Sequence, residues 1–109
     1  MSAAIARNIA NILYSMSGTT WSLGDFVASH TAANALPLGS VSGSLGWATL
    51  FNADANNAVQ MYNNNSDLTH PILQIPPQGF NVVTFYTACV PYFLAITADV
   101  KVEFMLLAQ

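Results

Sequence analysis

From Ser44 to the C-terminus the chain is a series of short apolar runs separated by turn-forming clusters, and this pattern restricts the fold more than any other feature. The runs are rich in β-branched and aromatic residues, which favour strands, and the clusters are rich in Asn, Asp, Pro and Gly, which favour turns. Six runs are present: 44–52, 58–62, 71–75, 80–88, 92–97 and 99–108. This spacing predicts an all-β fold, an antiparallel β-sandwich or a jelly-roll-like barrel of about seven to eight short strands.

The segment before these runs allows two interpretations. In the first, residues 11–16 and 20–23 form a hairpin that turns at Gly18. In the second, an amphipathic helix ends at Gly18, because five apolar residues fall at helical spacing: Ile5, Ile9, Ile12, Leu13 and Met16. Residues 28–44 are small and polar with few apolar anchors, which predicts an extended connection over the surface.

The chain length of 109 residues suits one domain that can hold a core without a metal ion or a disulfide. We assign residues 1–19 to an N-terminal arm or first strand and residues 20–109 to a single β-sandwich domain. Cys89 is the only cysteine, so no disulfide can form within one chain. Its apolar setting, FYTACVPYF, predicts a buried thiol.

Charge is scarce: charged residues make up 6% of the chain, against about 25% in typical soluble domains. With two cationic residues and a net charge of −3, the chain lacks the means to neutralise phosphates, so we expect no nucleic-acid partner. Pro and Gly interrupt every long uncharged stretch, so we expect no membrane-spanning helix, and the start shows no signal-peptide pattern. The scarcity of charge instead predicts a surface buried between subunits.

Two of the predicted strands are apolar on both faces. In the last strand, Met105 and Leu107 lie opposite the ordinary core face of Val100 to Leu106. In the run FNVVTFY, Val83 and Phe85 lie opposite the face of Phe80 to Tyr86. Because a lone sandwich should expose a polar outer face, the second face of each strand predicts a contact with another copy or a partner. The predicted interface residues are therefore Met105, Leu107, Val83 and Phe85.

A search for catalytic chemistry finds no convergent set of groups, so we predict no enzyme, no catalytic residue, no cofactor and no metal site. His30 and His70 stand in polar, turn-like settings typical of surface histidines. The Asp54 region fails the calcium-loop pattern, because Val59 and Asn65 occupy the positions that need Gly and Glu. One ligand patch remains as an alternative, a polar-aromatic loop tip that could bind a glycan: Tyr62, Asn63, Asn64 and Asn65.

From Trp21 to the C-terminus the chain has a Trp-led strand, then LPLGSVSGSLGWATLFNADANNAVQMY, then a Pro-Ile-Leu strand ending in IPPQG, and finally ADVKVEFMLLA. In this series of strands and turns the stretch resembles small β-sandwich structural proteins of tailed bacteriophage virions. The resemblance implies a symmetric homo-oligomer, with a trimer as the commonest arrangement. It also implies the major capsid protein or tail proteins as partners. The expected location is the virion, on the capsid surface or the tail, after synthesis in the host cytoplasm.

The leading functional hypothesis is therefore a capsid decoration or cement protein that stabilises the head lattice through apolar subunit contacts. A component of the tail, neck or baseplate is the first alternative. A fibre or adhesin domain that binds a host glycan is the second.

Overall fold

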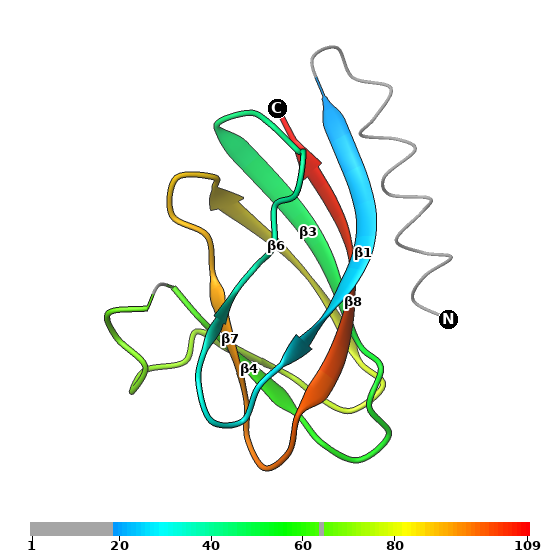
Figure 1. The fold of residues 1–109 in the computed structure, drawn as a ribbon, viewed down its shortest axis with the longest axis vertical. Coiled ribbons are helices and arrows are strands. Elements are labelled where there is room, and N and C mark those ends of the chain that lie inside the picture. The colour runs from blue at the N-terminus through cyan, green and yellow to red at the C-terminus, as the bar shows by residue number, and fades with distance from the viewer. Residues whose placement is uncertain (1–18, 64) are drawn as a thin grey trace.

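The computed structural model describes residues 19–63 and 65–109. The helix interpretation of the N-terminal segment and the first arm of the hairpin interpretation concern residues outside this described part, and so does the prediction for Asn64. Residues 20–23, the second arm of the predicted hairpin, form part of a strand. Within the described residues the chain forms eight strands (Figure 1). They are β1 (Thr20–Ala28), β2 (Asn34–Ala35), β3 (Leu45–Asn52), β4 (Val59–Tyr62), β5 (Leu73–Ile75), β6 (Phe80–Tyr86), β7 (Tyr92–Ala95) and β8 (Val100–Ala108).

The strands form two four-stranded antiparallel sheets. The first sheet has the order β1-β8-β3-β6 and the second has the order β2-β7-β4-β5. Figure 1 shows β1, β8 and β3 side by side in the first sheet. This strand order is that of a jelly roll, in which the chain passes repeatedly between the two sheets. The all-β sandwich prediction is confirmed.

The six predicted runs each contain one strand, and the turn clusters fall between them. The structure adds β2, a two-residue strand inside the predicted connection at 28–44, and it extends β1 to Ala28. The sequence of β2 has no apolar pattern. Asn34 and Ala35 form a strand because their backbones pair with those of Phe93 and Tyr92. No described residue belongs to a helix long and apolar enough to cross a membrane.

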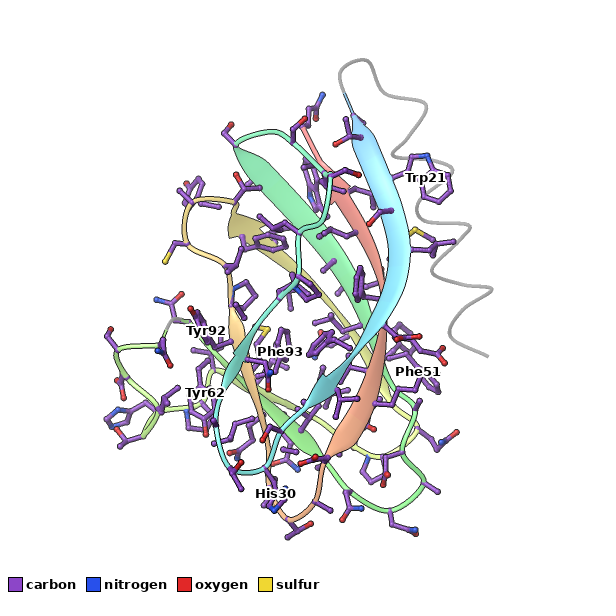
Figure 2. All side chains as sticks on the ribbon, in the orientation of Figure 1. Trp21, His30, Phe51, Tyr62, Tyr92 and Phe93 are labelled. Carbon is purple, nitrogen blue, oxygen red and sulfur yellow. The ribbon has the colours of Figure 1, made fainter. Side chains whose placement is uncertain are left out.

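The main core lies between the two sheets. Alternate residues of β8 point into it, and Val100, Val102 and Leu106 are fully buried. From the second sheet, Phe93 contributes the largest fully buried side chain, which Figure 2 shows between the sheets. The ring centroid of Phe26 on β1 lies 5.2 Å from that of Phe93, so aromatic packing joins the two sheets directly.

Candidate functional site

The first sheet carries an apolar outer face, which we define as the side of this sheet that points away from the second sheet. The strand register aligns its residues in rows across β1, β8, β3 and β6. One row is Trp21, Leu107, Trp47 and Thr84, and the next is Leu23, Met105, Thr49 and Val82. Figure 2 shows Trp21 directed away from the sandwich.

Exposed apolar side chains are concentrated on this outer face. Ten large hydrophobic residues are exposed in the described part, with exposed fractions from 36% to 72%. Seven of the ten belong to the outer face: Trp21, Leu23, Val27, Leu45, Phe80, Val82 and Tyr86. The exposed side chains lie on the edge strands β1 and β6 and at the start of β3, whereas Met105, Leu107 and Thr49 between them are buried.

Charge is confined to one end of the outer face. Asp25, Lys101 and Glu103 lie there on β1 and β8, and Lys101 Nζ is 3.7 Å from Asp25 Oδ2. β6 contributes no charged residue to the face. The face is therefore neutral and apolar along its β6 side.

Met105 and Leu107 lie on the outer face, as the alternation of the last strand predicts, but they are not exposed. They are 0% and 1% exposed in the single chain, and Trp47 packs against them in a small cluster separate from the main core. A neighbouring copy is therefore not needed to bury these two side chains.

The prediction that Val83 and Phe85 form an interface is wrong, because both side chains face the main core. Val83 is 8% exposed, and Phe85 packs against the core cluster. The register explains the choice: Val83 pairs with Ala48 and Phe85 with Gly46, the small core-facing residues of β3. A Cβ at Gly46 would come within 2.5 Å of the Phe85 ring, so the absent side chain provides the space for this ring. The exposed face of β6 carries the alternate residues Phe80, Val82, Thr84 and Tyr86.

The predicted ligand patch does not form a platform. Tyr62 is only 3% exposed, and its hydroxyl donates to Gln60 Oε1 at 3.0 Å, so its ring is not available for stacking on a sugar. Asn63 and Asn65 are exposed. Asn63 borders a shallow hollow of about 500 Å³ whose other lining residues are Leu45, Thr84, Phe85, Tyr86 and Cys89.

Cys89 is exposed, which corrects the prediction of a buried thiol. The residue follows β6 in a tight turn, where its backbone N–H donates to the carbonyl of Tyr86 at 2.9 Å. The apolar neighbours in the sequence belong to β6 and β7, whereas Cys89 itself lies on the turn between them. The apolar neighbours of Cys89 in the sequence therefore do not bury its side chain in the fold.

The titratable groups form small, separate, exposed pairs. His30 Nδ1 lies 2.6 Å from Asp99 Oδ1, which links the end of β1 to the turn before β8. His70 Nδ1 lies 2.9 Å from Asp67 Oδ2 in the loop between β4 and β5. The described residues contain no group of three or more His, Cys, Asp or Glu side chains placed to hold a metal ion. Figure 2 shows His30 at the end of the sandwich, away from the outer-face residue Trp21.

Hydrogen bonds lower the pKa of three carboxyl groups. The Thr69 hydroxyl donates to Asp67 Oδ1 at 2.8 Å, and this bond, together with His70 and the Thr69 backbone N–H, holds the pKa of Asp67 at about 2. The bond from His30 lowers the pKa of Asp99. Backbone N–H groups of Asn56 and Asn57 lower the pKa of Asp54.

We expect the stability contribution of Asp67 to disappear at acid pH. Its pKa is depressed from 3.8 to about 2 on folding, so the contribution is complete well above pH 3.8 and is lost as the pH falls through about 2. The effect is small, since the carboxyl is exposed and screened by solvent. Urea midpoints of the wild type and Asp67→Asn, measured from about pH 5 to pH 2, should converge as the pH falls. A difference that is independent of pH would contradict this assignment.

Comparisons with known proteins give a fold relationship. No model of a known protein family matches the chain, and no curated protein sequence matches it. Among solved structures, the chain is similar to a protein of the Bacillus endospore appendages, which are described as a novel family of disulfide-linked pili. The two share 13% sequence identity with a TM-score of 0.54, over 82% of each chain. At this identity the likeness shows a shared β fold.

Proposed function

We propose that this chain is a non-enzymatic structural subunit, which functions by association with further copies and with the other proteins of a large particle. The observation that supports this proposal is the outer face, which holds seven of the ten exposed large hydrophobic residues in the described part. The low content of charged residues, 6%, points in the same direction, because a free monomer would have little charge to keep it apart from its neighbours.

The energetics fit a contact that is repeated in an assembly. Full burial of a large apolar side chain contributes about 1.5–3 kcal/mol relative to exposure. The seven residues are already partly buried, so covering them would contribute roughly 5–10 kcal/mol. This is comparable with the cost of bringing two molecules together, about 4–15 kcal/mol, so one contact alone is weak and many contacts in a lattice are strong.

The particle that we propose is the virion of a tailed phage, with this chain as a decoration or cement protein on the head lattice. The sequence resemblance supports this location, and jelly rolls are common among viral capsid domains. The partners would be other copies, as a trimer in the simplest arrangement, and the major capsid protein. As a component of the tail, neck or baseplate, the chain would make the same apolar contacts but would be present in fewer copies per virion.

A second candidate is a subunit of a surface filament. The fold likeness to the pilus protein of the Bacillus endospore appendages favours it. A filament needs a heterologous contact that does not close into a ring, whereas the trimer proposed for the decoration protein is a closed oligomer.

Copy number in the particle tests the proposal. Quantitative mass spectrometry of purified virions should give a ratio to the major capsid protein near one or a simple fraction of it. A handful of copies would move the chain to the tail, neck or fibres. Absence from the virion, together with filaments of the purified protein in electron micrographs, would replace the virion proposal with the filament candidate.

We expect substitutions on the outer face to weaken self-association. Leu23→Ser combined with Phe80→Ser removes one exposed apolar side chain from each edge strand of the first sheet. Each loss should cost about 1 kcal/mol or more, so the association constant should fall by about tenfold or more in sedimentation velocity.

The matched control is Ile72→Ser combined with Ile96→Ser, because these residues are 56% and 48% exposed but lie outside the outer face. This control should leave self-association unchanged. An equal loss in both double variants would indicate unspecific adhesion and would count against the outer face as the contact.

A further inference from the structure

β6 is an edge strand without the usual protection against pairing. It lies at the end of the first sheet, and among the described residues only β3 pairs with it. Its seven residues, FNVVTFY, include no charged residue and no proline. Natural edge strands normally carry charged residues or proline, or are very short, because the unpaired backbone groups of an open edge can pair with another strand.

The register with β3 shows which backbone groups of β6 point to the open side. Asn52 N–H donates to Gly79 O, and Thr87 N–H donates to Ser44 O, so the odd-numbered residues of this strand face β3. Because the direction alternates along an antiparallel strand, the backbone groups of the even-numbered residues point outward. These residues are Phe80, Val82, Thr84 and Tyr86.

The same four residues place their side chains on the outer face, and their order is self-complementary. If β6 meets an antiparallel β6 of a second copy with Val83 at the centre, Phe80 stands opposite Tyr86 of the second copy and Val82 stands opposite its Thr84. Aromatic pairs and β-branched pairs are favourable opposite each other on antiparallel strands. A shift of two residues in either direction leaves at least one of the four outward residues without an opposite outward residue.

We propose that two copies of this chain pair antiparallel along β6, centred on Val83, and so join their first sheets into one eight-stranded sheet. The inference rests on the proposed function, since it adds a second contact between copies to that of the outer face; because it is two-fold, it joins subunits of neighbouring trimers and not the subunits within one trimer. The pairing forms an isologous contact around a two-fold axis. It also makes the two apolar outer faces continuous across the joint.

Pairing requires the exchange of one hydrogen bond. In the single chain the outward N–H of Val82 donates to Asn81 Oδ1 at 2.9 Å. On pairing, this N–H donates instead to the carbonyl of Thr84 in the second copy. The Tyr86 carbonyl already accepts from Cys89 N–H, and a carbonyl oxygen can accept a second bond. In the single chain, the Asn81 side chain thus accepts the hydrogen bond from the outward N–H group of Val82.

Cysteine cross-linking tests the register. Val82→Cys and Thr84→Cys are made as separate proteins in a Cys89→Ser background, because Cys89 is exposed and would react. Both positions are exposed, so the substitutions should not disturb the core. The two proteins are mixed and oxidised with diamide. The expected main product is a dimer that links position 82 of one copy to position 84 of the other.

The matched control is a mixture of Phe80→Cys and Thr84→Cys in the same background, which tests a register shifted by two residues. It should give much less dimer. Equal yields from both mixtures, or no dimer from either, would overturn the pairing.

A charge on the open edge gives a second, independent readout. Val82→Lys replaces the β-branched partner of Thr84 with a charge and places the two lysines of the pair diagonally across the proposed joint, about 7–8 Å apart. Both changes oppose pairing, so self-association should weaken by about tenfold or more in sedimentation velocity. Ile96→Lys is the control at matched exposure, 48% against 45%, away from β6. If the wild type associates but neither Val82→Lys nor the cross-links respond, the β6 contact is wrong and the proposed function stands. If the wild type does not associate at all, the β6 contact is wrong, and the copy number in the particle decides the proposed function separately.

Discussion

Replacement of Phe93 by alanine should lower the free energy of unfolding by about 3–5 kcal/mol, a large part of the 5–15 kcal/mol typical of a domain. Phe93 is 0% exposed and is the largest fully buried side chain of the described core. Its ring meets Phe26 of the first sheet at a centroid distance of 5.2 Å. The substitution therefore removes buried area, leaves a cavity and breaks an aromatic contact between the sheets.

Urea unfolding followed by intrinsic fluorescence and circular dichroism measures this loss. Phe93→Leu should lose about 1–1.5 kcal/mol, because it keeps most of the buried volume. Phe80→Ala is the control on the outer face, where the ring is 44% exposed, and its cost should not exceed about 1.5 kcal/mol. Equal losses for Phe93→Ala and Phe80→Ala would show that the core is not centred between the two sheets.

Replacement of Asn52 by leucine should cost about 3–5 kcal/mol, although leucine is similar in size and more apolar. Asn52 is 0% exposed, and its side chain joins three segments. Its Nδ2 group donates to Asn57 O at 2.8 Å and to Ile75 O at 3.1 Å, and its Oδ1 atom accepts from Asp54 N–H at 2.9 Å. Leucine removes these three bonds to backbone groups near the ends of β3 and β5.

The matched control for this substitution is Asn56→Leu, in the same turn but exposed. It should change stability by no more than about 0.5 kcal/mol. Hydrogen exchange at Asp54 gives a local readout, since its N–H loses the bond to Asn52 only in the Asn52 variant. A neutral effect of Asn52→Leu would mean that water replaces the amide, and would remove this residue from the account of stability.

The strand pattern could be predicted because it depends on local chemistry. Turn clusters such as 76–79 and the β-branched run at 80–86 set where the chain bends and where it extends, whatever the rest of the fold does. β2 could not be predicted, because its two residues are a strand only through their backbone pairing with β7.

The candidate surface was predicted only in part. The last strand has two charges on one face, so the alternation placed Met105 and Leu107 correctly on the outer side, but their burial depends on packing around Trp47. In β6 both faces are apolar, and the pattern alone favoured the wrong one. The exposure of Tyr62 was likewise predicted wrongly. A tyrosine beside three asparagines suggests an exposed loop tip, but the sequence does not show whether its ring points into the core or into solvent.

Local sequence is therefore sufficient to predict short antiparallel strands and to show that some of them carry apolar residues on both faces. The residues that make this surface depend on long-range pairing. Side chains alternate with a period of two, so the choice of face follows the register, and the register of β6 places Phe85 and Val83 opposite Gly46 and Ala48 of its neighbour β3. These two small residues admit Phe85 and Val83 to the core and leave Phe80, Val82 and Tyr86 exposed outside.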